Sequence, residues 1–144
     1  MANRNYFNQS FSLIPGLVKI FARVTFAASG VPTLVAAQSK GVVSVTRDAQ
    51  GLFTFVFGTQ AGMLDVYNKL LGVNILFDAI TDDSSAGDSP TAPFYYLTAN
   101  SVAVAASCSL QIGFCATANS ATPIDPANGE AIYVEFTFRN STAN

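Results

Sequence analysis

The sequence predicts an all-β fold, a jelly-roll-like β-sandwich or barrel of about 7–8 strands with one short helix at about 63–71. Apolar and polar residues alternate with period two along most of the chain, turn-forming residues recur at intervals of roughly ten, and only one segment has helical spacing. A length of 144 residues suits one domain with one core. We divide the chain into an extended N-terminal arm (1–16), a single β domain (17–140) and a polar tail (141–144).

The first predicted strand follows the turn signal Pro15-Gly16. Its alternation predicts a covered side made of Val18, Ile20, Ala22, Val24 and Phe26, and a wetter side made of Lys19, Phe21, Arg23 and Thr25. A turn signal at 29–32 precedes a short extended piece at 34–37.

The next two strands form a predicted hairpin. In the segment VVSVTR, Val43 and Val45 alternate with polar residues and are expected to share a covered side. The loop Asp48-Ala49-Gln50-Gly51 follows, because Asp starts turns and Gly accepts a positive φ. The segment LFTFVF is the partner strand.

One helix is predicted from spacing. Met63, Leu64, Tyr67, Leu70 and Leu71 recur at intervals of three and four, and Gly72 lies where a helix commonly ends. Extended character returns over 73–80.

The last third of the chain predicts three more strand regions. The aromatic run 94–97 precedes a long alternation over 102–114, which exceeds usual strand length, so we expect a break among its alanines. In the final segment AIYVEFTFR, the covered side consists of Ile132, Val134, Phe136 and Phe138.

Charge is scarce in this chain. Charged residues make up 11% and hydrophobic residues 50%, whereas soluble domains carry about 25% charged residues. A folded surface of ~7,000 Å² would carry only 16 charged side chains (7 basic plus 9 acidic), a composition that suits burial against other proteins. The stretch 89–124 contains none, so we expect it, together with the arm, to meet other subunits, and the acidic loop at 82–88 to face solvent.

The same composition excludes several functions. A net charge of -2 without a cluster of Lys or Arg argues against nucleic acid as a partner. The chain contains neither His nor Trp. Without His it can form no His-dependent catalytic triad and no His metal site. Prolines and polar residues interrupt the uncharged stretch, and the opening MANRNYFNQSF lacks the pattern of a secretory signal, so we expect no membrane partner.

Acidic residues do not form a recognisable site. Asp82, Asp83 and Asp88 share one loop, but their spacing differs from that of a calcium-binding loop, so a solvated loop is the favoured interpretation. Glu130 and Glu135 have opposite parity near the last strand and are interpreted as surface acids.

The two cysteines do not indicate catalysis or a disulfide. Cys108 and Cys115 are seven residues apart, which on a continuous strand spans about 23 Å and places the side chains on opposite sides. We interpret Cys108 as a core residue and Cys115 as a half-buried thiol. The sequence therefore predicts no catalytic residue, no cofactor, no metal and no enzymatic activity.

The aromatic residues are the candidate binding residues. Several fall where a sandwich core has no place for them, and aromatic side chains are favoured in interface cores. The alternative is that they cap the ends of the sandwich. The candidate interface residues are Tyr6, Phe7, Phe11, Phe21, Phe94, Tyr95 and Tyr96.

The order of segments resembles that of a known family. RVTF, SGVPTLV, QSKGVVSVTRDAQGLFTFVF, YNKLLGVNILF and DPANGEAIYVEFTFRNST resemble the small capsid decoration, or cement, proteins of tailed bacteriophages, from about Phe21 to the C-terminus. The resemblance implies a jelly-roll-like domain on the outer surface of the virion capsid, made in the host cytoplasm. It implies two partners, the major capsid protein and further copies of the chain as a dimer or trimer at local symmetry axes. The family has no catalytic residues to carry over.

Two other functions stay open at this point. The first is a phage tail or fibre subunit, which the sequence pattern barely separates from a head protein. A carbohydrate-binding β-sandwich would use exposed aromatic rings, although Trp is absent. A hydrolase on a β scaffold is disfavoured by the absence of His.

Overall fold

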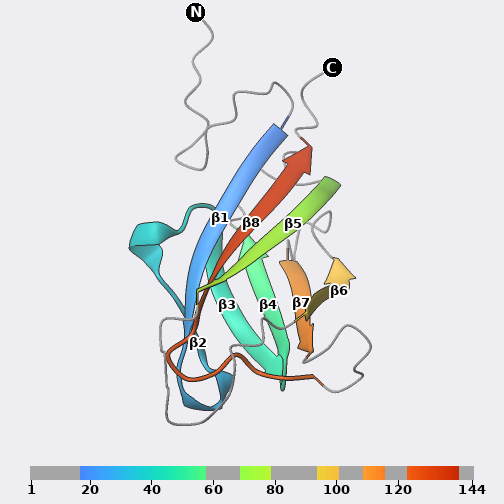
Figure 1. The fold of residues 1–144 in the computed structure, drawn as a ribbon. Coiled ribbons are helices and arrows are strands. Elements are labelled where there is room, and N and C mark those ends of the chain that lie inside the picture. The colour runs from blue at the N-terminus through green and yellow to red at the C-terminus, as the bar shows by residue number, and fades with distance from the viewer. Residues whose placement is uncertain (1–16, 58–68, 79–93, 101–108, 116–122, 140–144) are drawn as a thin grey trace, which may run out of the picture.

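Two antiparallel sheets pack face to face in the computed structural model of this chain (Figure 1). The structure describes residues 17–57, 69–78, 94–100, 109–115 and 123–139. Within them, the first sheet consists, in spatial order, of β2 (Pro32–Leu34), β1 (Leu17–Phe26), β8 (Ala131–Arg139) and β5 (Lys69–Asp78). The second sheet consists of β3 (Val42–Ala49), β4 (Leu52–Phe57), β7 (Ser109–Cys115) and β6 (Phe94–Asn100).

Strands that are far apart along the chain pair within each sheet. β1 pairs with β8 in the first sheet, and β4 pairs with β7 in the second. The chain therefore passes between layers after β2, β4, β5 and β7. The all-β sandwich predicted from the sequence is confirmed, with eight strands in the described residues.

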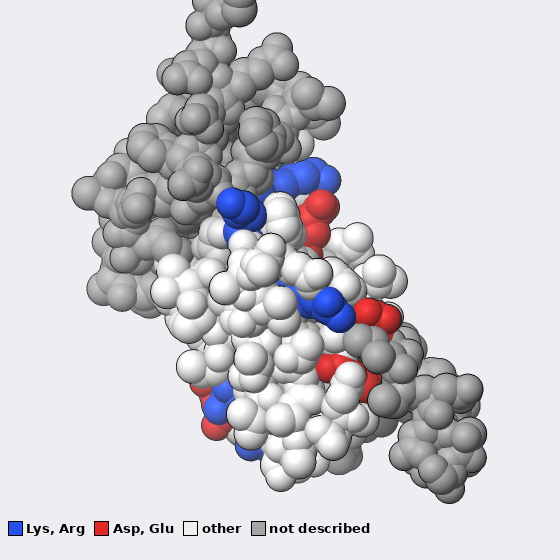
Figure 2. All heavy atoms as spheres, turned by 90° about the vertical axis from the view of Figure 1, so that its left-hand side faces the viewer, with Lys and Arg blue, Asp and Glu red and all other residues white. Residues whose placement is uncertain are grey.

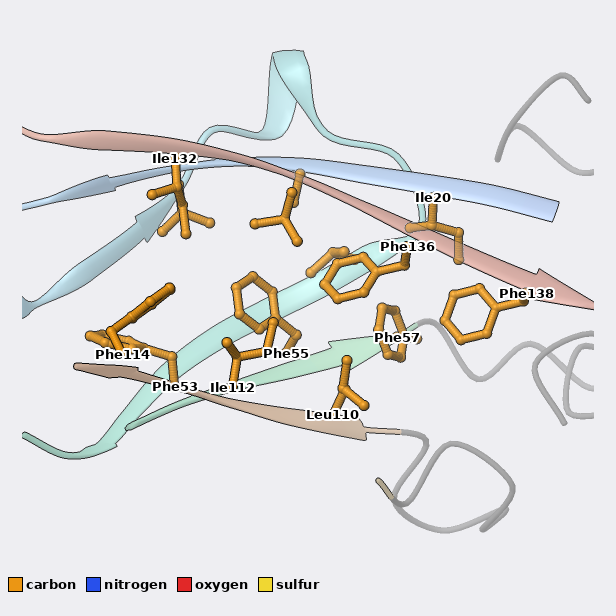
Figure 3. Close-up of a cluster of buried hydrophobic side chains, with 14 of the residues drawn as sticks. Ile20, Phe53, Phe55, Phe57, Leu110, Ile112, Phe114, Ile132, Phe136 and Phe138 are labelled. Atoms are coloured by element: carbon orange, nitrogen blue, oxygen red, sulfur yellow. The ribbon is translucent and has the colours of Figure 1, made fainter. Parts of the chain in front are cut away.

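The core lies between the two sheets (Figure 3). Phe55 and Phe57 of β4 are fully buried and face Phe136 and Phe138 of β8, while the buried Phe53 lies beside Phe114 of β7. The rings meet edge to face, with centroids 5.3 Å apart for Phe55 and Phe136 and 4.9 Å apart for Phe57 and Phe136. Because each buried large side chain contributes roughly 1.5–3 kcal/mol, this aromatic layer is a main source of stability.

Several predicted elements are confirmed in detail. All five residues assigned to the covered side of β1 are buried, as are the four assigned to β8. The predicted hairpin between β3 and β4 is confirmed with a shorter loop than predicted, because Asp48 and Ala49 still belong to β3, and Gly51 has φ 67°. The long alternation predicted over 102–114 is described only from Ser109, where β7 begins, and the alanines at which we expected a break lie outside the described residues.

The helix predicted at 63–71 is wrong for its last three residues. Lys69, Leu70 and Leu71 belong to β5, while residues 63–68 lie outside the described part of the chain. The register of β5 against β8 shifts between Leu70 and Gly72. This bulge lets Leu70 and Val73, three residues apart, both pack on the core, and such spacing imitates a helix.

Two shorter predictions also need correction. Val43 is 64% exposed and Val42 is buried, because a bulge between Val42 and Ser44 changes which side of β3 faces inward. The extended piece predicted at 34–37 ends earlier, since β2 stops at Leu34 and residues Ala36–Gln38 form a 3-10 turn, η2. A second 3-10 turn, η1, covers Ala28–Gly30.

Candidate functional site

The structure places the predicted interface residues in two separate regions. Phe21 lies on the outer face of the first sheet and is 43% exposed. Tyr95 and Tyr96 lie in β6 at the edge of the second sheet, and Phe94 is the first residue of that strand. The arm residues Tyr6, Phe7 and Phe11 lie outside the described residues. The sequence grouped these aromatics together, whereas the described ones do not form one patch.

The first region is an apolar edge strand without charge. Tyr95, Tyr96 and Leu97 are 39%, 42% and 48% exposed, and we call these three consecutive residues the tyrosine edge. Within the described chain, β6 pairs with β7 on one side only. Proteins usually protect such edges with charges, prolines or a covering segment, because an open edge recruits other strands. β6 itself contains neither a charged residue nor a proline.

The two tyrosines point to opposite sides of β6, as predicted. Tyr95 is opposite the buried Phe114, and its hydroxyl donates a hydrogen bond of 3.3 Å to the carbonyl oxygen of Val73 in the other sheet. Tyr96 is opposite Gly113, and a Cβ atom at Gly113 would lie 2.5 Å from Tyr96 Cζ. The absence of a side chain at Gly113 therefore lets the Tyr96 ring lie over β7.

A polar network covers the outer face of the second sheet beside Tyr96. Thr98 in β6 donates to the side chain of Gln111 in β7 at 2.7 Å, and Gln111 donates to Asp48 in β3 at 2.6 Å. Thr46 and Thr54 donate to the same carboxylate. Burial alone would raise the pKa of Asp48. The hydrogen bonds from Thr54, Gln111 and Thr46 together have the larger effect, so the pKa of Asp48 is lower than usual. The ionised carboxylate of Asp48 thus serves as the acceptor that joins β3, β4 and β7 on this face.

The second region is the outer face of the first sheet, which we call the ionic face. It carries the ion pair Lys19–Glu135 at 2.9 Å, and Arg23 lies with its guanidinium carbon 5.1 Å from the centre of the Tyr133 ring. Leu76 is 66% exposed beside Tyr133. Sequence reasoning missed Leu76 and Tyr133, although both are large apolar residues on the polar side of their strands, which is the signal that identified Phe21.

A separate ionic contact holds the loop before β8. Arg47 Nε and Nη2 donate to Asp125 at 3.0 and 2.8 Å, and the Gly51 amide donates to Asp125 at 2.8 Å. The hydrogen bond from Arg47, with smaller help from Gly51, lowers the pKa of Asp125, and the same bond raises the pKa of Arg47. This contact anchors the loop on the β3–β4 hairpin.

The remaining candidate residues have structural partners or lie elsewhere. Glu130 accepts a hydrogen bond of 2.6 Å from the Ala127 amide, and Glu135 pairs with Lys19. Cys115 is buried, more deeply than predicted. Cys108 and the acids Asp82, Asp83 and Asp88 lie outside the described residues. Among the residues that the structure describes, no three potential ligands gather into a metal site, and no helix is long and apolar enough to cross a membrane.

Charged groups are sparse on the face of the molecule that Figure 2 draws. Figure 2 shows the blue and red side chains in a few small groups, separated by white surface that carries no charge. Such surface loses little electrostatic solvation when another protein covers it.

Comparison of the chain with protein families, with curated proteins and with solved structures found no match.

Proposed function

We propose that this chain is a structural virion protein that binds the outside of an assembled phage capsid and stabilises it by bridging neighbouring major capsid protein subunits. The observation that carries the proposal is the tyrosine edge, an exposed and charge-free edge strand. The resemblance of the segment order to capsid decoration proteins supplies the identity of the partner.

The tyrosine edge suits protein contact in two ways. On the side away from β7, its main-chain groups have no strand partner among the described residues and offer hydrogen bonds to an added strand, while its side chains offer aromatic and aliphatic area. Thr98 is the polar residue that continues the strand, and its hydroxyl is already engaged with Gln111. A partner that covers the edge therefore leaves no charge of β6 buried without a counterion.

The mechanism that we propose is mass action. A protein that binds the assembled shell, and not its separated subunits, stabilises the shell by its binding free energy. Because the shell repeats the same site many times, contacts of modest strength at each site add up to a large resistance to disassembly.

The test uses cosedimentation of the full chain with undecorated shells. Tyr96→Arg places a charge on the tyrosine edge and is expected to lower occupancy at least tenfold, since an uncompensated charge in an interface costs several kcal/mol. Val43→Arg is the matched control, because Val43 is 64% exposed on β3 at the opposite edge of the same sheet. We expect this control to bind like the unaltered chain.

Two results would overturn the proposal. One is the absence of shell binding by the unaltered chain, with the protein located in tail density of the particle instead. The other is equal loss of binding for Tyr96→Arg and Val43→Arg, which would remove β6 from the contact. Deleting residues 2–11 tests the proposed role of the arm separately, and we expect reduced occupancy.

A further inference from the structure

The outer face of the second sheet carries one aromatic ring that lies flat on it. Tyr96 in β6 is opposite Gly113 in β7 and is 42% exposed. A Cβ atom placed on Gly113 would have three ring carbons of Tyr96 as its nearest neighbours, Cζ at 2.5 Å and Cε1 and Cε2 at 2.8 Å. Because this position is closer to the ring carbons than to the hydroxyl oxygen beyond them, Gly113 lies beneath the face of the ring. The other face of the ring is therefore turned away from the sheet.

The polar network begins in the next row of residues. Gln111 lies two residues along β7 from Gly113. It is opposite Thr54 in β4, which in turn is opposite Thr46 in β3. Rows two residues apart along a strand are separated by about 7 Å. The aromatic ring and the polar network thus lie side by side, at a spacing that one pyranose ring with its hydroxyl groups can span.

The polar network uses its own hydrogen-bond donors internally. Thr98 donates to Gln111, and Gln111 donates to Asp48. Thr46 and Thr54 donate to the same carboxylate. Each threonine hydroxyl has one proton, so these hydroxyls can offer a ligand only their lone pairs. The network therefore offers mainly acceptors, which a ligand rich in hydroxyl or amine donors would match.

The charge of the network narrows the class of ligand. None of the ion pairs within the described residues includes Asp48, so its carboxylate leaves the face negative and repels an anionic ligand. Its Oδ1 already accepts from Thr46, and its Oδ2 accepts from Thr54 and Gln111. A bidentate guanidinium uses both carboxylate oxygens and would compete with these donors. Neutral hydroxyl groups, each of which needs one lone pair, match the face better.

We propose that the outer face of the second sheet binds a neutral glycan, with one pyranose ring stacked on Tyr96 and its hydroxyl groups donating to Asp48 and Gln111. A sugar combines the two chemistries that lie side by side here. Its C–H groups pack on the negative face of an aromatic ring, and its hydroxyl groups donate from the rim. The bonds to Asp48 are charge-assisted, and the network already holds the side chains of Asp48 and Gln111 in place, so little side-chain freedom is lost on binding.

The inference goes beyond the proposed function and does not depend on it. A strand added to β6 would lie in the plane of the sheet, whereas the glycan would lie on its outer face. Glycan binding is measured on the purified chain without shells, so the failure of either proposal leaves the other unaffected.

The first experiment probes an array of neutral and acidic glycans with the full chain, displayed as a tetramer on streptavidin so that weak contacts add. We expect binding to neutral glycans and no binding to their sialylated, sulfated or phosphorylated counterparts. Titrating the best neutral glycan into the isotope-labelled chain then locates the site by two-dimensional NMR. The side-chain amide of Gln111 and the backbone amide of Gly113 are expected to shift, and the amide of Gly72, in the other sheet, is expected to stay unchanged.

Variants of Tyr96 test the stacking contact. Tyr96→Ala removes the ring and is expected to weaken glycan binding roughly tenfold, whereas Tyr96→Phe keeps the ring and is expected to stay within about threefold of the unaltered chain. Tyr133→Ala is the matched control, because Tyr133 is 38% exposed on the first sheet. We expect this control to bind like the unaltered chain.

Asp48→Asn tests the polar contact, since it removes the charge and keeps the shape of the side chain. It is expected to weaken binding of the neutral glycan roughly tenfold. It is also expected to reduce the discrimination against acidic glycans, an effect that a purely structural role of Asp48 would not produce. Circular dichroism verifies that each variant is folded.

Four results would overturn the proposal. The first is an array on which no neutral glycan binds, and the second is a set of shifts that leaves Gln111 and Gly113 unchanged. The third is equal weakening by Tyr96→Ala and Tyr133→Ala. The fourth is a shift of Gln111 and Gly113 with acetyl-arginine amide and with no neutral glycan, which would assign the face to a basic side chain of a protein partner.

Discussion

The hairpin between β3 and β4 gives a sharp test of how the sequence specifies this fold. Gly51 has φ 67°, a left-handed conformation that other residues adopt at a cost of roughly 1–2 kcal/mol. A Cβ atom there would lie 2.8 Å from the amide nitrogen of Ile124 and 2.8 Å from the carbonyl oxygen of Phe114. These are main-chain atoms, so the crowding cannot be relieved by rotating a side chain.

The substitution Gly51→Ala is therefore expected to be strongly destabilising. Forcing extra atoms into a packed site costs about 1–3 kcal/mol, which adds to the conformational cost for a total of about 2–5 kcal/mol. The shift also strains the 2.8 Å hydrogen bonds that Gly51 makes with the Phe114 amide and with Asp125. Since domains of this kind have a stability of roughly 5–15 kcal/mol, the loss is a large fraction of the total.

Urea unfolding followed by circular dichroism measures the effect. For a slope of roughly 1–3 kcal/mol per M, the midpoint of Gly51→Ala should fall by at least about 0.7 M. Gly72→Ala is the matched control, because no atom lies within 4 Å of a Cβ atom placed on Gly72 and its φ is not left-handed. We expect the control to change stability by less than about 0.5 kcal/mol. Equal midpoints for the two variants would refute the reasoning.

Three further predictions concern single side chains. Phe136→Ala removes a fully buried ring and should cost about 3–5 kcal/mol in urea unfolding; a loss below about 1 kcal/mol would contradict the described core. Tyr95→Phe removes the hydrogen bond to Val73 and should cost about 0.5–1.5 kcal/mol without changing the fold, as near-ultraviolet circular dichroism can verify. Arg47 lowers the pKa of Asp125, so its stabilisation is complete above the unfolded pKa of about 4 and is lost as pH falls through the lower folded value. The stability difference between the unaltered chain and Asp125→Asn should therefore shrink below about pH 4, and a difference independent of pH would refute the assignment.

Sequence reasoning identified part of the candidate site. Phe21, Tyr95 and Tyr96 were recognisable because large aromatics on the polar side of a strand, or in adjacent positions, cannot all enter one core. Leu76 and Tyr133 carry the same signal but join Phe21 only through the pairing of β5 and β1 with β8. No local pattern reveals that pairing, because it joins strands that are far apart along the chain.

The sequence by itself determined the all-β class, the inward sides of β1 and β8, and the hairpin loop ending at Gly51. Period-two alternation and the conformational freedom of glycine are local properties, so the residues concerned reveal them directly. Only the tertiary structure decided that residues 69–71 form strand, that Val43 faces outward, and that Phe21, Tyr133 and Leu76 share one face of the first sheet. A bulge changes the parity of every later residue in its strand, and strand order is set by long-range pairing, so both depend on partners that the local sequence does not contain.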